Sequence, residues 1–126
     1  MKVFFVLGCA NAFMSVALGA FGAHMLRDKV TELMMVTWGK GVDYQMYHAL
    51  ALIIIALCIK QWPEVRRVRT AGFLLLMGMV LFCGSLYALV LTQIKGIGMI
   101  TPIGGITLLW GWILLALCAR NFDNRY

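Results

Sequence analysis

The chain has 126 residues, of which 63% are hydrophobic and 13% are charged, and its formal net charge is +6. A soluble domain of this length needs more charge on its surface to stay hydrated, so this composition excludes an ordinary soluble protein. The positive residues flank apolar runs and do not form one patch, which argues against a nucleic-acid-binding protein. We therefore expect no nucleic acid among its partners.

Four long runs of the sequence contain no Asp, Glu, Lys or Arg. A run of about 20 apolar residues is long enough to cross the hydrocarbon core of a bilayer as a helix. The sequence therefore predicts an all-α fold, an integral membrane four-helix bundle that forms one domain over residues 1–126. The predicted spans are close to residues 3–24, 42–61, 70–93 and 101–120.

The first predicted span carries small residues at helical spacing. They share one helical face and are Gly8, Ala12, Ser15, Gly19 and Ala23. Small residues let another helix backbone approach closely, which is how helices associate in lipid. Asn11 lies beside this stripe, and because an amide in hydrocarbon needs a partner, we expect it to face a neighbouring helix.

The segment from Leu26 to Trp38 has a different pattern. Its apolar residues recur at helical spacing, and its charged residues, such as Arg27 and Glu32, take the other face. The segment is too short and too charged to span a membrane. It predicts a short amphipathic helix at the outer interface between spans one and two, and Gly39 would then permit a turn into span two.

The remaining spans carry start and stop signals. Pro63 cannot continue a helix, so span two is expected to end before it. In span three, Gly84 and Ala88 form another close-packing pair. Span four is expected to begin at Thr101, whose hydroxyl can cap the helix, followed by Pro102 at the first helical position.

His24 and His48 are the only side chains that normally titrate near neutral pH. His24 ends span one and His48 opens span two, so both are expected near the outer membrane surface, within reach of each other and of Tyr44. Two histidines on facing helices can ligate haem or copper, or can move protons. The alternative is that each ring only satisfies a helix-end carbonyl or a buried tyrosine.

Other constellations for chemistry are weak. The cysteines occur one in each span, without the spacing of a disulfide framework or a zinc site, and are expected to pack as small apolar residues: Cys9, Cys58, Cys83 and Cys118. The spans carry no embedded carboxylate, which argues against coupled transport. We predict no catalytic residue, no metal site and no cofactor. The sequence leaves open whether the protein is an enzyme but favours a non-enzymatic one.

The positive residues predict the orientation of the chain. One side of the four-span arrangement carries Lys2, Lys60, Arg66, Arg67, Arg69, Arg120 and Arg125. The other side carries Arg27, Lys29, Lys40 and Lys95, diluted by acidic residues. The positive-inside rule then places both termini in the cytoplasm. Arg66, Arg67 and Arg69 are also expected to attract anionic lipid head groups.

Four short motifs carry a resemblance to a known family. They are Gly-Ala-Phe-Gly-Ala-His at 19–24, Tyr44 followed by His-Ala-Leu-Ala-Leu at 48–52, Gly-Ser-Leu-Tyr at 84–87, and Thr-Pro-Ile-Gly-Gly at 101–105 leading into Trp-Gly-Trp at 110–112. Their order and spacing resemble the small four-helix membrane proteins of domain-of-unknown-function family 423. The resemblance implies an inner-membrane or plasma-membrane protein, for which roles in envelope or membrane integrity have been suggested. It implies no set of catalytic residues.

These motifs all fall in the predicted outer half of the bundle. They predict a polar cluster of His24, Tyr44, His48, Ser85, Tyr87 and Thr101. The cluster would fix helix register or line an outward-facing pocket for a lipid, a quinone or another apolar ligand. Helix packing is predicted at Gly8, Ala12, Ser15, Gly19, Gly22, Gly78, Gly84, Pro102, Gly104, Gly105 and Gly111.

Three hypotheses about function follow. The first is a non-enzymatic membrane protein that acts through lipids or partner proteins in membrane or envelope homeostasis. The second is a binding or redox site for a small apolar ligand or haem near His24 and His48. The third is a small-solute channel or permease, which would require several copies of so small a bundle. The expected partners are membrane lipids and either a second copy of the chain or other membrane proteins.

Overall fold

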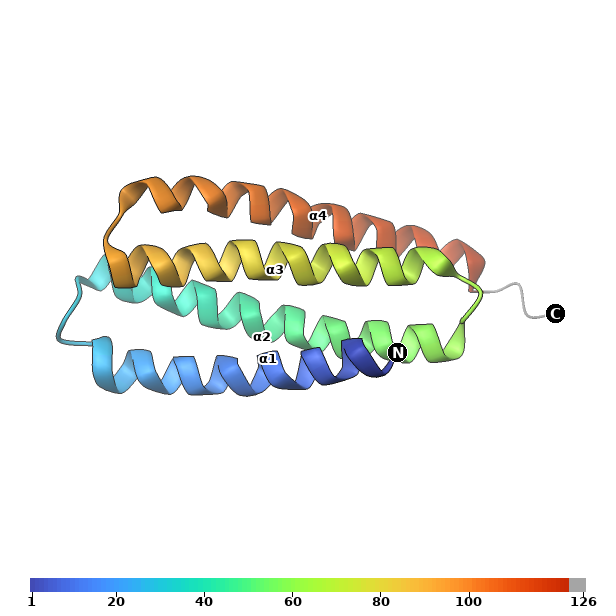
Figure 1. Ribbon diagram of the computed structural model, residues 1–126, viewed down its shortest axis with the longest axis horizontal. Coiled ribbons are helices and arrows are strands. Elements are labelled where there is room, and N and C mark those ends of the chain that lie inside the picture. The colour runs from blue at the N-terminus through green and yellow to red at the C-terminus, as the bar shows by residue number, and fades with distance from the viewer. Residues whose placement is uncertain (123–126) are drawn as a thin grey trace.

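Four long helices with short connections make up the computed structural model, which describes residues 1–122 (Figure 1). The helices are α1 (Lys2–Phe21), α2 (Glu32–Gln61), α3 (Arg66–Thr92) and α4 (Ile100–Cys118). One turn of π-helix (Gly22–Leu26) extends α1, and 3₁₀ turns lie before and after α4 (Lys95–Met99 and Ala119–Asn121). Each long helix is long and apolar enough to cross a membrane. The predicted all-α four-helix membrane fold is therefore confirmed.

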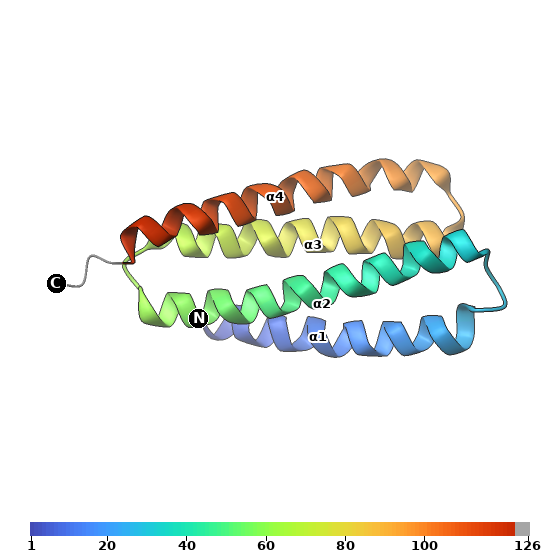
Figure 2. The ribbon, with the colours of Figure 1, turned by 180° about the vertical axis from the view of Figure 1, so that it is seen from behind.

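The helices follow one another as antiparallel neighbours. Helix α1 packs against α2, α2 against α3, and α3 against α4. Figures 1 and 2 show α1 and α4 at opposite edges of this row, with α2 and α3 in the middle. The two central helices consequently contribute most of the buried residues, whereas α1 and α4 leave wide apolar faces uncovered.

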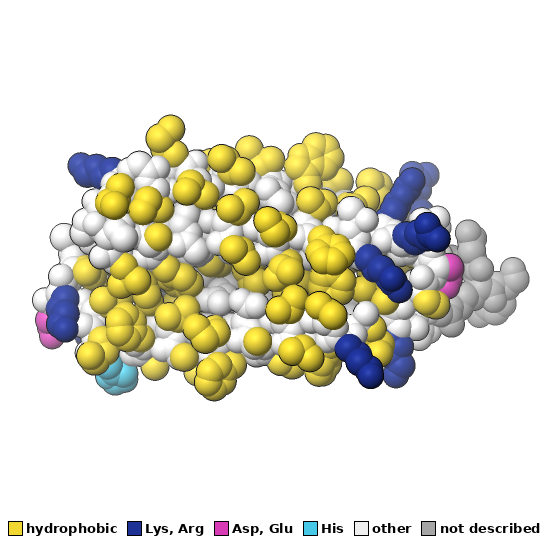
Figure 3. All heavy atoms as spheres, viewed as in Figure 1, with side chains coloured by type: hydrophobic (Ala, Val, Ile, Leu, Met, Phe, Trp, Pro, Cys, Tyr) yellow, Lys and Arg dark blue, Asp and Glu magenta, His cyan; other side chains and the backbone are white. Residues whose placement is uncertain are grey.

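The surface has the charge distribution of a membrane-embedded protein. On the face that Figure 3 shows, hydrophobic side chains are spread along the molecule, and Lys and Arg side chains gather at its two ends. Residues such as Phe13, Ile106 and Leu109 point outward, where acyl chains can cover them. Arg125 lies outside the residues that the structure describes.

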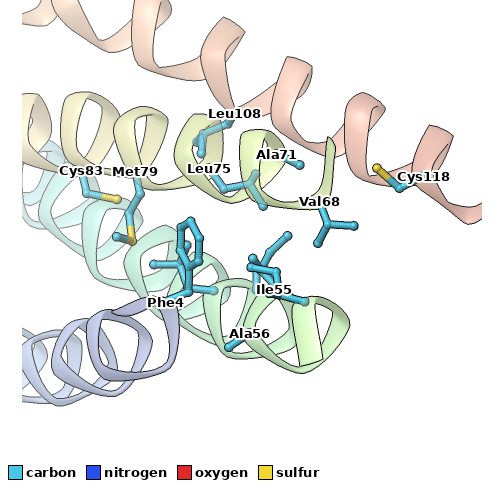
Figure 4. Packing of buried hydrophobic residues seen from close by; sticks show 13 residues of the cluster. Phe4, Ile55, Ala56, Val68, Ala71, Leu75, Met79, Cys83, Leu108 and Cys118 are labelled. Atoms are coloured by element: carbon cyan, nitrogen blue, oxygen red, sulfur yellow. The ribbon is translucent and has the colours of Figure 1, made fainter. Parts of the chain in front are cut away.

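The apolar core lies mainly between α2 and α3. Figure 4 shows Ile55 of α2 and Leu75 and Met79 of α3 meeting there, with Phe4 reaching in from α1 and Leu108 from α4. Edge-to-face packing of Phe4 on the Phe73 ring, with centroids 5.1 Å apart, ties the start of α1 to α3.

Glycines set the distance between α3 and α4. A Cβ atom on Gly104 would overlap the backbone of Phe82, one on Gly78 would lie 2.7 Å from Leu108 Cγ, and one on Gly111 would lie 2.8 Å from Leu75 Cδ2. The two backbones can therefore approach closely only because these positions lack side chains.

Small residues play the same part between α1 and α2. A Cβ atom on Gly8 would lie 2.8 Å from the carbonyl oxygen of Ala49, and one on Gly19 would lie 3.3 Å from Val42 Cγ1. Ser15 is buried on the same face, and Ala12 is half-buried. Ala23 is exposed instead, and Gly22, three residues after Gly19, lies against Trp38.

Three predicted packing positions differ from these. Gly84 is exposed and has open space where a Cβ would be, and Pro102 is also exposed. Gly105 is in ordinary contact, with its Cβ position 3.8 Å from Phe82 Cδ2. The residues of α3 that face α4 include positions 78, 82 and 85, so Gly84 points away from that interface.

The separate interfacial helix predicted between spans one and two is wrong. Helix α2 begins at Glu32, capped by the Thr31 hydroxyl, which accepts a hydrogen bond from the Met34 amide at 3.2 Å, and it runs without a break through Gly39. Trp38 points inward, where it is 3% exposed. Because the apolar face of this segment buries itself between α1 and α3, the segment forms the first turns of the span and does not lie on the interface.

Candidate functional site

A chain of three polar side chains connects α1, α2 and α3 inside the bundle. Gln45, 8% exposed, donates from Nε2 to Asn11 Oδ1 at 3.0 Å. The Tyr87 hydroxyl donates to Gln45 Oε1 at 2.7 Å. The Asn11 amide in turn donates to the carbonyl oxygen of Leu7 at 2.9 Å. Each buried polar atom in this Asn11–Gln45–Tyr87 chain therefore has a partner, which is what a low-dielectric interior requires.

His48 makes a second connection, on the side of α2 that faces α4. The Trp112 indole N–H donates to His48 Nε2 at 3.1 Å, and His48 Nδ1 lies 2.7 Å from the carbonyl oxygen of Tyr44. An indole nitrogen can only donate, so Nε2 is the acceptor and the ring proton lies on Nδ1, which donates to Tyr44. Both nitrogens of His48 are thus used within the protein, and neither is free to bind haem iron or copper.

A third pair connects α3 and α4. The Ser85 hydroxyl donates to the Phe82 carbonyl oxygen at 2.9 Å, and the Thr101 hydroxyl lies 2.6 Å from Ser85 Oγ. Because Ser85 has one proton and gives it to Phe82, Thr101 is the donor in this pair. Thr101 is the second residue of α4 and does not cap it, so the predicted capping role is wrong: the helix begins at Ile100 without a side-chain cap.

The predicted polar cluster is therefore divided between separate contacts. Tyr44 packs on Phe82 with ring centroids 4.9 Å apart and lies near His48, with centroids 6.1 Å apart. Tyr87 belongs to the chain around Gln45 instead. Ser85 and Thr101 form the pair at the α3–α4 interface.

His24 does not join any of these contacts. It is exposed on the π-turn that precedes α2. Helix α2 begins at Glu32, so His48 lies 16 residues, or about 24 Å, along its axis. The predicted approach of His24 to His48 at the outer surface is therefore wrong, because α2 starts earlier than the sequence pattern predicted and carries His48 toward the middle of the helix.

The sequence identified most of the polar side chains inside the bundle but not their hydrogen-bond partners. The amide of Asn11 lies in an apolar run, which indicated that it needs a hydrogen-bond partner on a neighbouring helix. Nothing in the sequence identified Gln45 as that partner. Trp38 and Trp112 were also missed as donors: the Trp38 indole N–H donates to the Leu18 carbonyl oxygen at 2.8 Å. Tryptophans are usually expected at the membrane interface, which hides such internal roles.

A groove runs between α2 and α4 over the surface of α3. One part, of about 400 Å³, adjoins a second part, of about 490 Å³, because both are lined by Phe82 and Gly105. The first part reaches His48 and Trp112, and the second reaches Lys40 near the start of α2. The lining of this α2–α4 groove is mostly apolar, so it suits an acyl chain or another apolar group.

The titratable side chains that line this groove are Lys40, Tyr44 and His48. The His48 nitrogens are hydrogen-bonded to Trp112 and Tyr44, as described above. Within residues 1–122, no group of three or more His, Cys, Asp or Glu side chains lies close enough together to hold a metal ion. Every buried side-chain nitrogen and oxygen in the described part of the chain has a hydrogen-bond partner.

Replacing Gln45 by leucine is expected to lower the free energy of unfolding by about 2 kcal/mol, because it removes two hydrogen bonds and leaves the Asn11 Oδ1 acceptor and the Tyr87 hydroxyl donor without partners. Tyr87→Phe removes one bond and is expected to cost about 1 kcal/mol. Equilibrium unfolding in mixed micelles, followed by circular dichroism, measures both changes.

Thr107→Val is the matched control for these variants. Its hydroxyl bonds only to the Ile103 carbonyl oxygen of its own helix, at 2.8 Å, so its loss should change stability little. A Gln45→Leu variant as stable as Thr107→Val would show that the Asn11–Gln45–Tyr87 chain does not hold the three helices together.

Comparisons with known proteins agree with this architecture. A family model described as protein of unknown function (DUF423) matches residues 18–105. The UPF0382 membrane protein YwdK of Bacillus subtilis (strain 168) is 46% identical over 122 residues, which cover 97% of this chain and 99% of that protein. A UPF0382 membrane protein of Staphylococcus epidermidis (strain ATCC 12228 / FDA PCI 1200) is 48% identical, with 97% and 98% of the two chains covered. No solved structure matches the chain.

Proposed function

This chain belongs to the family of membrane proteins described as protein of unknown function (DUF423), and we propose that it acts there without catalysing a reaction. Its four-helix bundle supports the integrity of the membrane through contacts with lipids or with other membrane proteins. The proposal follows from how the polar side chains of the spans are used.

The observation that carries the proposal is that these polar side chains bond helix to helix. The Asn11–Gln45–Tyr87 chain joins α1, α2 and α3, and the His48–Trp112 bond joins α2 and α4. A catalytic group must be free to exchange a proton or to meet a substrate atom. Side chains that are all engaged with one another serve instead to hold a rigid bundle in one register.

The proposal includes the location and orientation of the bundle. It lies in the plasma membrane with the start of α1 and the end of α4 on the cytoplasmic side. The support is the charge asymmetry: the end that carries Lys2, Lys60 and the arginines of early α3 is more positive than the end that carries Lys95. A reporter fused to the C-terminus, active only in the cytoplasm, tests this orientation.

Complementation tests the function itself. A Bacillus subtilis strain in which YwdK is deleted should take up more of a membrane-impermeant dye than its parent, and this chain should restore the parental level. His48→Gln removes the titratable ring but keeps an oxygen that can accept the Trp112 N–H, and Ser85→Ala removes one hydroxyl. Both variants should still restore the membrane, whereas Gly104→Ala, which separates α3 from α4, should fail.

Two results would contradict the proposal. The first is a deletion strain with the same dye uptake as its parent. The second is a His48→Gln variant that reaches the membrane in normal amounts but restores nothing. This second result would favour the other candidate function, a binding site for a small apolar ligand, which is supported by the apolar lining of the α2–α4 groove beside His48. Haem binding at this site is not supported, because both nitrogens of His48 are already hydrogen-bonded and neither is free to ligate iron.

A further inference from the structure

A separate groove lies between α1 and α2 at the end of the bundle where α1 begins and α2 ends. It has a volume of about 340 Å³. Its walls are apolar apart from two lysines, and its lining residues are Met1, Lys2, Phe5, Val6, Ala56, Leu57 and Lys60. This α1–α2 groove shares no lining residue with the α2–α4 groove.

Two lysine side chains line this groove, and no carboxylate is among its lining residues. Lys2 and Lys60 come from antiparallel neighbouring helices and line the same hollow. Among residues 1–122, the only acidic residue at this end is Glu64, which lines a different hollow together with Arg66. Two like charges held near each other repel, and an anion between them removes that repulsion.

The other acidic residues of the described chain are too far away to help. Asp43 is the nearest of them along α2, and it lies 17 residues from Lys60, or about 26 Å along the helix axis. Within residues 1–122, no carboxylate lines this groove beside the two lysines, so their charge is complementary to that of an anion.

The apolar walls lie on the membrane side of the two lysines. Val6 is one helical turn from Lys2, and Ala56 is one turn from Lys60. Phe5 and Leu57 are about half exposed, so the groove opens toward the surrounding lipid. One hollow thus offers ammonium groups at the level of the lipid head groups and apolar side chains at the level of the acyl chains.

We infer that the α1–α2 groove binds an anionic phospholipid of the adjacent leaflet. The phosphate of the lipid lies between the Lys2 and Lys60 ammonium groups. The first part of one of its acyl chains lies against Phe5, Val6 and Leu57. This site differs from the Arg66, Arg67 and Arg69 cluster, which belongs to the start of α3. It does not depend on the proposed function, because a lipid can occupy the groove whatever the bundle does.

Native mass spectrometry of the full-length protein in mild detergent tests the site. The protein is titrated with dioleoyl phosphatidylglycerol and, separately, with dioleoyl phosphatidylcholine, whose phosphate is balanced by choline. We expect one retained phosphatidylglycerol at concentrations where phosphatidylcholine is not retained. The Lys2→Gln/Lys60→Gln variant should bind phosphatidylglycerol at least tenfold more weakly, because it loses both ammonium groups.

Two further variants make the result specific. Arg67→Gln/Arg69→Gln removes the same amount of charge from the same end of the bundle but not from the groove, so it should weaken phosphatidylglycerol binding by less than the lysine-to-glutamine variant does. Lys2→Arg/Lys60→Arg keeps both charges and should also bind, which separates loss of charge from loss of folding. Equal retention of the two lipids by the unmodified protein, unchanged binding by the lysine-to-glutamine variant, or equal loss in the arginine variant would each overturn the inference.

Discussion

Replacing Gly104 by alanine is expected to lower the free energy of unfolding by about 3 kcal/mol, the upper part of the range for overpacked positions. The added Cβ would overlap the backbone nitrogen of Phe82 and lie 2.8 Å from its Cα. Backbone atoms of a packed helix cannot rotate away as the tip of a side chain can. The helices α3 and α4 must therefore separate, and the contacts on either side of Gly104 loosen with them. Equilibrium unfolding in mixed micelles measures the loss.

The neighbouring glycine provides a matched control. A Cβ on Gly105 would lie 3.8 Å from Phe82 Cδ2, an ordinary contact. Gly105→Ala makes the same chemical change one residue away and is expected to leave stability unchanged or slightly higher, since alanine favours a helix over glycine. If the two variants were equally stable, the close approach of α3 and α4 at Gly104 would not be a requirement of the fold.

Replacing Trp38 by alanine is expected to cost about 3 kcal/mol or more. The Trp38 ring is 3% exposed and packs on Tyr87, with centroids 4.7 Å apart, while its N–H donates to the Leu18 carbonyl oxygen at 2.8 Å. The variant therefore leaves a cavity between α1, α2 and α3 and removes the indole hydrogen bond to Leu18. Trp38→Phe keeps most of the packing and loses only the hydrogen bond, so it should cost about 1 kcal/mol.

Trp110 provides a control for Trp38, because it faces the membrane and is not packed inside the bundle. It is 60% exposed on the outward face of α4. Trp110→Ala should change the unfolding free energy little, because the ring packs against lipid in the folded protein and has no buried partner to lose. If Trp38→Ala were as stable as Trp110→Ala, Trp38 would not be buried between the helices. It would then lie at the membrane interface, as the sequence pattern predicted.

Trp38 shows why part of the fold can be predicted from the sequence and part cannot. The pattern of residues 26–38 is amphipathic in either arrangement, on the interface or packed inside. What decides between them is whether a neighbouring helix has room for the Trp38 indole, and that room exists because Gly22 lacks a side chain. Such a complementary pair cannot be recognised from either residue alone.

The candidate site shows the same division. Ser85, Thr101, Tyr44 and His48 were predicted to lie in one polar cluster. The structure joins Ser85 to Thr101 by a hydrogen bond and places the Tyr44 ring against Phe82. The pairing of His24 with His48 failed because it assumed a late start for α2. The partner of His48 is Trp112, 64 residues along the chain, which no local spacing indicates.

The sequence by itself determined the number of spans, the all-α class and the separation of charged ends from an apolar middle. These properties depend on the free energy of transferring each short segment from water into lipid, which is set residue by residue. Only the tertiary structure decided which polar side chains meet. Those contacts depend on the rotation and register of neighbouring helices, which glycines such as Gly8, Gly78 and Gly104 set together. A rotation of one helix exchanges every partner on its face at once, so the pairing is a property of the whole bundle and not of any segment.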